Sequence, residues 1–127
     1  MGTISNWRIL VVEDEPDGQE VVKGILEHFN VSSTAVETAE EAVETLGNAQ
    51  YNAVVIDLGL PGMDGLELIE AIRTNPGTAH LPCIAVTAFH TSAVKQQALK
   101  AGFNAYFPKP INDGAFVKEL DRLASGG

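Results

Sequence analysis

Residues 54–65 read VVIDLGLPGMDG, an apolar run that ends on the carboxylate of Asp57 and continues into a segment rich in glycine. Short apolar runs with β-branched residues are typical of buried strands. In open parallel sheets, ligands bind beyond the carboxyl ends of the strands, which is where Asp57 would lie. Gly59, Pro61 and Gly62 are residue types that let a chain turn tightly after such an edge. The stretch therefore predicts a buried strand that delivers a carboxylate to a ligand site.

Four more apolar runs of this kind alternate with segments of helical spacing along the chain. The predicted strands are residues 8–12, 31–36, 53–56, 83–87 and 105–107. The predicted helices are residues 20–29, 39–48, 66–75, 92–102 and 114–124. Strands that are each followed by a helix predict an α/β fold, with a five-stranded parallel sheet and helices on both faces. We expect one domain over residues 1–127, with a core of about 7–124.

Two local signals mark the ends of predicted helices. Thr38 followed three residues later by Glu41 predicts a capping box at the start of the second helix. Gly102 follows the fourth helix, where a left-handed residue commonly ends a helix. Both signals agree with the division into strands and helices.

The charge of the chain is negative and unevenly distributed. The formal net charge is −9: residues 1–70 carry 14 acidic and two basic side chains, whereas residues 71–127 carry three acidic and six basic ones. Nucleic-acid phosphates are bound by clustered Lys and Arg, so direct binding of nucleic acid is not expected. An uneven charge can orient a protein partner by long-range attraction, although an acidic face without a partner has the same composition.

No apolar stretch approaches the roughly 20 residues needed to cross a bilayer, and the N-terminus lacks the pattern of a secretion signal. We therefore expect a cytoplasmic protein that does not bind membranes. Cys83 is the one cysteine, so a small core residue is expected there rather than a disulfide or a cysteine metal cluster. The histidines are spaced too far apart to predict a metal site, although His90 can overlook the same sheet edge as Asp57.

Polar residues follow four of the five predicted strands, and the carboxyl ends of parallel strands meet at one edge of a sheet. Alone, an acid or a threonine after a strand is most often a loop residue or a helix cap, and a lone lysine is most often solvated. Together they match the chemistry of phosphate and Mg²⁺: carboxylates are hard ligands for the metal, and lysine and threonine donate to phosphoryl oxygens. Aspartate can itself attack phosphorus. The residues are Glu13 and Asp14 after the first strand, Asp57 after the third, Thr87 and Ala88 at the fourth, and Lys109 after the fifth.

These residues carry a resemblance to a known family. The segments VVEDE (11–15), VVIDLGLPGMDG (54–65), AVTA (85–88) and FPKPI (107–111) resemble the CheY-like receiver domain of bacterial response regulators in two-component signalling. The resemblance covers about residues 7–124. It implies a flavodoxin-like, doubly wound sheet with strand order 2-1-3-4-5. It also implies a phosphorylation-dependent switch that catalyses only its own phosphotransfer and dephosphorylation.

The resemblance assigns roles to individual residues. Asp57 would be the phosphoacceptor, and Thr87, Lys109 and the backbone N–H of Ala88 would hold the phosphoryl oxygens. Tyr106 would be the aromatic partner of Thr87 in the switch.

The resemblance also implies a metal site. Asp14 and Asp57 would bind Mg²⁺ directly, Glu13 would act through water, and Gly59 would offer its backbone carbonyl. Mn²⁺ can take the place of Mg²⁺ in this ligand set. A cis peptide at Lys109–Pro110 is also implied.

The implied phosphodonor is a histidine kinase or a histidine phosphotransfer protein. ATP is not expected as the direct donor, because the chain has no GxxxxGK[ST] motif. The implied output is a downstream protein target that binds the face made by the fourth helix, fifth strand and fifth helix. The resemblance leaves open whether the phosphorylated form is a homodimer.

Four alternatives are also open. The chain can be a receiver cut from a hybrid histidine kinase or larger regulator, or a receiver-like interaction scaffold that is never phosphorylated. A flavodoxin-like electron carrier is disfavoured because EDEPD (13–17) replaces the phosphate-binding loop that such a carrier needs. A dedicated aspartate-nucleophile phosphatase is disfavoured because Gly59 occupies the place of its second aspartate.

Overall fold

The computed structural model describes residues 6–60 and 64–124, in which five strands alternate with five helices. The strands are β1 Arg8–Val12, β2 Ser32–Val36, β3 Ala53–Asp57, β4 Cys83–Thr87 and β5 Ala105–Pro108. The helices are α1 Pro16–His28, α2 Ala39–Asn48, α3 Gly65–Thr74, α4 Ser92–Ala101 and α5 Asp113–Ala124. The predicted α/β pattern is confirmed. The predicted turn residues Pro61 and Gly62 lie outside the described residues.

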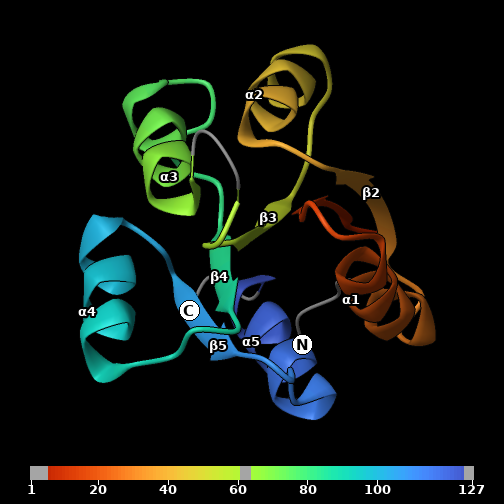
Figure 1. Ribbon diagram of the computed structural model, residues 1–127. Helices are drawn as coiled ribbons and strands as arrows, with labels where there is room; N and C mark the ends of the chain where they lie inside the picture. The colour runs from red at the N-terminus through yellow and green to blue at the C-terminus, as the bar shows by residue number, and fades with distance from the viewer. Residues whose placement is uncertain (1–5, 61–63, 125–127) are drawn as a thin grey trace.

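The strands form one parallel sheet in the order β2-β1-β3-β4-β5, as predicted (Figure 1). The register pairs Val12 of β1 with Ile56 of β3, so the residues that follow β1 lie beside Asp57. It also pairs Asp57 with Val86 of β4, and Thr87 with Pro108 of β5. The carboxyl ends of β1, β3, β4 and β5 therefore meet at one edge of the sheet.

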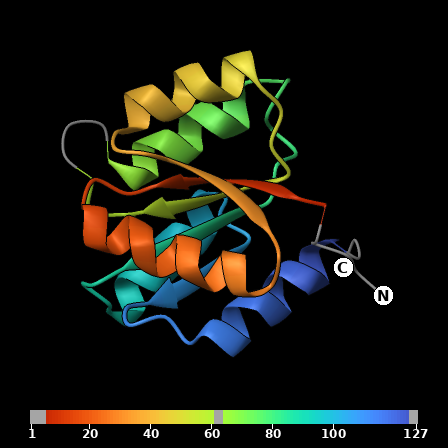
Figure 2. The ribbon, with the colours of Figure 1, turned by 90° about the vertical axis from the view of Figure 1, so that its right-hand side faces the viewer.

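Alternate residues of the central strands point to opposite faces of the sheet, as the pleat requires. Leu10 and Val12 pack in a cluster with buried residues of α2, α3 and α4, whereas Ile9 and Val11 pack with buried residues of α1 and α5. Figure 2 shows the sheet between α2 and α3 above and α1 and α5 below. All five residues of β3 are buried, which explains why its sequence is a continuous apolar run up to Asp57.

The start of α1 and the cap of α2 differ from the predictions, whereas the other helix bounds agree to within one residue. Helix α1 begins at Pro16, four residues before the predicted start, because proline fits the first turn, where its missing N–H is not needed. Thr38 caps α2 by accepting from the N–H of Glu41 at 3.0 Å, but the Glu41 carboxylate accepts from the N–H of Glu37 instead of that of Thr38.

The complete capping box lies at α3 instead, where Asp64 accepts from the N–H of Glu67 at 2.9 Å and Glu67 accepts from the N–H of Asp64 at 3.2 Å. The prediction for Gly102 is confirmed, since this residue follows α4 with a φ of 123°.

Two further predictions concern the interior and the membrane. Cys83 is a buried core residue, and burial raises the pKa of its thiol to about 11, so the thiol stays protonated. In the part of the chain that the structure describes, none of the helices combines the length and the apolar character needed to cross a membrane.

We predict that Gly65→Ala destabilises the protein, because a Cβ there would lie 2.8 Å from the Cα of Leu58 and 2.9 Å from the carbonyl oxygen of Asp57. Backbone atoms cannot rotate away as a side chain can, so the start of α3 must shift. The expected loss is roughly 1–3 kcal/mol in the free energy of unfolding, measured by urea denaturation.

The matched control is Gly47→Ala in α2, where a Cβ would meet nothing within 4 Å. This variant should be roughly 0.5–1 kcal/mol more stable than wild type, because alanine is the better helix former. Equal stabilities for the two variants would contradict the close approach at Gly65.

Candidate functional site

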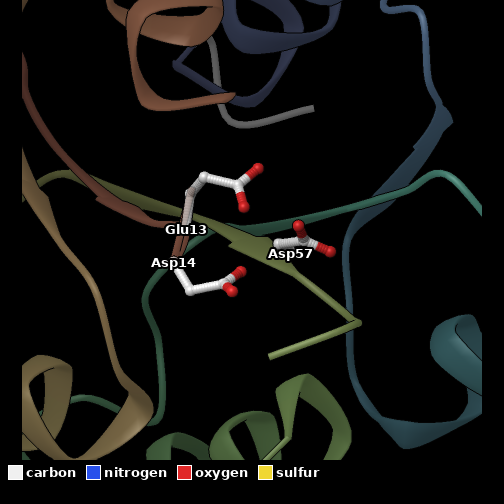
Figure 3. A group of neighbouring side chains, drawn as sticks. All are labelled: Glu13, Asp14 and Asp57. Atoms are coloured by element: carbon white, nitrogen blue, oxygen red, sulfur yellow. The ribbon is translucent and has the colours of Figure 1, made fainter. Parts of the chain in front are cut away.

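The acidic residues predicted at the strand ends come together in space. Glu13 and Asp14 follow β1, and Asp57 is the last residue of β3. Each offers a carboxylate oxygen, and the three oxygens lie within 4.8 Å of one another. In Figure 3, the Glu13 and Asp14 side chains point toward the side on which Asp57 lies. The sheet register thus assembles a cluster of three carboxylates from two segments, with Asp57 43 positions after Asp14.

Lys109 joins two of these carboxylates. Its Nζ lies 2.5 Å from Oε1 of Glu13 and 3.1 Å from Oδ2 of Asp57. Partial burial alone would lower the pKa of Lys109, but its bonds to Glu13 and Asp57 outweigh that effect and raise the pKa. Lys109 therefore stays positively charged and compensates part of the negative charge of the cluster.

Glu13 is the most deeply buried acid of the cluster, with 2% of its surface exposed. Burial, followed by the hydrogen bond with Asp57, raises the pKa of Glu13 to about 7, although Lys109 acts in the opposite direction. The backbone around Glu13 is held by Gln19, whose Nε2 donates to the Glu13 carbonyl at 2.8 Å.

Asp57 is oriented by Gly59, whose carbonyl the resemblance assigns to the metal site. The N–H of Gly59 donates to Oδ1 of Asp57 at 2.9 Å, while Oδ2 accepts from Lys109. Asp57 is only 8% exposed, so its carboxylate lies in the floor of the site with both oxygens engaged.

Thr87 and Lys109 are linked through the backbone, since the N–H of Lys109 donates to the Thr87 carbonyl at 2.8 Å. The Thr87 hydroxyl is buried and accepts from the N–H of Phe89 at 3.0 Å. Ala88, which lies between Thr87 and Phe89 in the chain, is exposed. The structure also contains the implied cis peptide at Lys109–Pro110.

Tyr106 is buried, with 8% of its surface exposed, and its hydroxyl lies 2.9 Å from Nδ1 of His90. The Tyr106 ring belongs to the buried cluster that packs with residues of α2, α3 and α4. The sequence analysis placed His90 near the site but missed its bond with Tyr106. No sequence signal shows this bond, because the two partners are 16 positions apart, with a helix between them.

The site fits a hard divalent cation. Three carboxylates and one ammonium leave an excess of negative charge when Glu13 is ionised, and carboxylate oxygens are the protein ligands that Mg²⁺ prefers. The lysine beside two acids also provides positive charge for an anionic group. The arrangement can therefore hold a metal ion and a phosphoryl group at the same carboxylate.

A parallel sheet of order 2-1-3-4-5 with this acidic edge is the architecture of a flavodoxin-like signalling domain. The sequence matches the response regulator receiver domain over residues 9–121, and the chain belongs to this family. Receiver domains are phosphoacceptor switches of two-component signalling that partner with histidine kinases, rather than enzymes with a substrate of their own. Membership of this family decides against the electron-carrier and dedicated-phosphatase alternatives.

Three similar proteins illustrate this membership. An uncharacterized 14.6 kDa protein of Leptolyngbya boryana is 38% identical over 112 residues, which are 88% of this chain and 86% of that protein. Chemotaxis protein CheY-3 of Vibrio cholerae is 29% identical over 119 residues, 93% of this chain and 92% of that protein. The receiver domain of a Pseudomonas aeruginosa sensor histidine kinase is 30% identical with a TM-score of 0.86, over 94% of this chain and 98% of that one. Its crystal structure has a magnesium ion coordinated in the active site cleft.

In the metal-free protein, Glu13→Gln is expected to change how the free energy of unfolding depends on pH. The pKa of Glu13 rises from 4.5, its ordinary value, to about 7 in the folded protein. A raised carboxylate pKa contributes stability that is complete below pH 4.5 and is lost as the pH rises to about 7. Wild type should lose up to about 3 kcal/mol relative to Glu13→Gln across this window.

The measurement is urea unfolding in the presence of a chelator at several pH values from 4.5 to 7. Glu20→Gln, which removes an exposed acid of α1, serves as the control and should follow the wild-type pH dependence. Parallel curves for wild type and Glu13→Gln would contradict the raised pKa.

Proposed function

We propose that Asp57 is the phosphoacceptor and takes its phosphoryl group, in the cytoplasm, from a phosphohistidine of a histidine kinase or a histidine phosphotransfer protein. The observation that carries the proposal is the position of Asp57. Its carboxylate ends a buried strand, lies 3.1 Å from Lys109 and shares the site with Glu13 and Asp14. A rigidly placed nucleophile beside a positive charge is what an in-line phosphoryl transfer requires.

In the transfer, a carboxylate oxygen of Asp57 attacks phosphorus and forms the P–O bond of an acyl phosphate. The P–N bond of the donor breaks, and its electron pair stays on the imidazole nitrogen. Lys109 offsets the negative charge that gathers on the phosphoryl oxygens, together with the Thr87 hydroxyl and the N–H of Ala88. Dephosphorylation follows when water attacks phosphorus and the Asp57 carboxylate leaves.

Mg²⁺ is the proposed cofactor, and Mn²⁺ suits the same oxygen donors. Asp14 and Asp57 would hold it directly, Glu13 through water, and Gly59 through its carbonyl. When bound, the ion supplies a Lewis acid that polarises a phosphoryl oxygen. Two observations support this assignment: the cluster of three carboxylates and the magnesium ion in the cleft of the related Pseudomonas receiver.

The proposed output depends on Thr87 and Tyr106. Phosphate on Asp57 would draw the Thr87 hydroxyl toward it and favour the inward position of the Tyr106 ring behind β4. Since a ligand shifts an equilibrium only through its different affinity for the two states, the partner must prefer one Tyr106 position. The burial of Tyr106 and its bond with His90 support an inward position as one of the two positions of the ring.

The proposed partner surface is formed by α4, β5 and α5. Lys95 and Lys100 on α4 and Lys118 on α5 are exposed there, whereas Arg122 is paired with Glu119 on the same helix. This surface suits a downstream protein with an acidic patch, or a second copy of the chain as a homodimer. A receiver cut from a hybrid kinase or larger regulator would use the same site and surface.

The nucleophile is tested with Asp57→Asn. Incubation with acetyl phosphate and Mg²⁺ should add one phosphoryl group to wild type, seen by intact-mass spectrometry, and none to Asp57→Asn. Asp17→Asn, which changes an exposed acid in the first turn of α1, is the control and should be phosphorylated like wild type. No adduct on wild type would favour the scaffold alternative, and an adduct on folded Asp57→Asn would place the acceptor elsewhere.

The switch is tested with Thr87→Ala. Beryllofluoride, a mimic of the phosphoryl group, should change the affinity of wild type for its partner or for a second copy by about 5- to 150-fold, the usual range of allosteric coupling. Thr87→Ala should lose most of this change while it still binds beryllofluoride, with binding and association measured by calorimetry. A full response in Thr87→Ala would show that Tyr106 is not coupled through Thr87.

A further inference from the structure

Gly18, in the first turns of α1, lies against the side chain of Glu13. A Cβ at position 18 would be 2.3 Å from Oε1 of Glu13, 2.6 Å from its Cδ and 2.9 Å from its Cγ. Atoms do not approach a Cβ this closely, so any other residue at position 18 must displace the Glu13 side chain. The backbone of α1 at Gly18 therefore forms one wall of the space that Glu13 occupies.

Three hydrogen bonds hold the side chain and the backbone of Glu13 in their present position. Oε1 receives a hydrogen bond from Lys109 at 2.5 Å, and Oε2 receives one from the N–H of Glu15 at 3.3 Å. The carbonyl of Glu13 accepts from Gln19 at 2.8 Å, which ties the backbone of Glu13 to α1. The end of a glutamate side chain is flexible, so the protein can accommodate a Cβ at position 18, but only by moving this carboxylate away from Lys109.

Glycine at this place is unfavourable for the helix itself, because glycine lowers helix stability relative to alanine. A second glycine of α1 separates this general cost from the specific contact. A Cβ at Gly24 would meet nothing within 4 Å. Of these two helix positions, only Gly18 faces an acid of the site.

We propose that Gly18 is a positioning residue: it leaves room for the longer acid, Glu13, and so holds the Glu13 carboxylate beside Lys109 and within reach of the metal. The part of this inference that concerns the metal rests on the proposed Mg²⁺ site. An aspartate at position 13 would lack Oε1 and Cδ of glutamate, the two atoms that a Cβ approaches most closely, but would keep the Cγ at 2.9 Å, so the clash would be smaller and not absent. The need for glycine at position 18 should therefore depend on which acid occupies position 13.

The first test measures melting temperatures of the metal-free protein, with Gly18→Ala and Gly24→Ala each made in wild type and in Glu13→Asp. Gly24→Ala should raise the melting temperature in both backgrounds. Gly18→Ala should lower it in wild type and lower it less in Glu13→Asp. The same rise from both alanine substitutions in wild type would overturn the proposal, and so would a loss from Gly18→Ala that is equal in the two backgrounds.

The second test measures the dissociation constant of Mg²⁺ by calorimetry in folded wild type, Gly18→Ala, Gly24→Ala and Asp14→Ala. Displacing a residue that supports a metal site typically weakens binding 10- to 100-fold, and we expect at least about tenfold for Gly18→Ala. Gly24→Ala should bind like wild type, and Asp14→Ala should lose the binding that belongs to this site. Equal constants for Gly18→Ala and wild type would overturn the positioning role toward the metal.

The two tests also separate this inference from the proposed function. No binding of Mg²⁺ by wild type would overturn the proposed metal site, while the melting temperatures would still decide whether Gly18 positions Glu13. A phosphorylation rate would not distinguish these cases, because Gly18 also lines a surface cleft with Val21, Lys109 and Ile111, so a substitution there changes the surroundings of Lys109 as well.

Discussion

The site depends on two ion pairs that Lys109 makes, one with Glu13 and one with Asp57. Lys109 and Glu13 are 96 positions apart in the chain, and Asp57 lies between them in sequence and in the sheet. Both ion pairs need β1 and β3 to be adjacent and β5 to end near the same edge, which is what the strand order provides. These two contacts, of 2.5 and 3.1 Å, therefore form only when most of the fold has formed.

Placing the Glu13 carboxylate in this cluster is unfavourable, because burial and the neighbouring Asp57 both oppose its ionised form. The pKa of Glu13 is raised for these two reasons, burial first. Lys109 compensates part of this cost, and the two apolar clusters on either face of the sheet hold the strands in place regardless of the charge at their ends. A cation bound at this edge would relieve the remaining repulsion, so the features that raise the pKa of Glu13 would also favour binding of a metal.

The sequence predicts the strands well because each is a short, nearly continuous apolar run, and the site residues follow because parallel strands end at one edge. Helix starts are less predictable: Pro16 opens α1 without an apolar signal, and Glu41 bonds Glu37 although its spacing from Thr38 fits a capping box. The complete box of Asp64 and Glu67 has the same spacing. Spacing shows which bonds a helix end can make, whereas the path of the preceding chain decides which ones form.

The contacts of Gly18 with Glu13 and of His90 with Tyr106 could not be predicted in this way, since each depends on how a loop or helix packs on a distant strand. Each contact involves a residue that the sequence analysis had singled out, Glu13 in the first and Tyr106 in the second. A motif shows which groups carry the chemistry, because their types and places are constrained by the reaction. The neighbours that hold those groups are constrained only by shape. A glycine or a histidine in the sequence therefore gives no sign of such a contact until the fold is known. In this protein the resemblance therefore predicts the reacting groups, and only the structure shows which neighbours contact them.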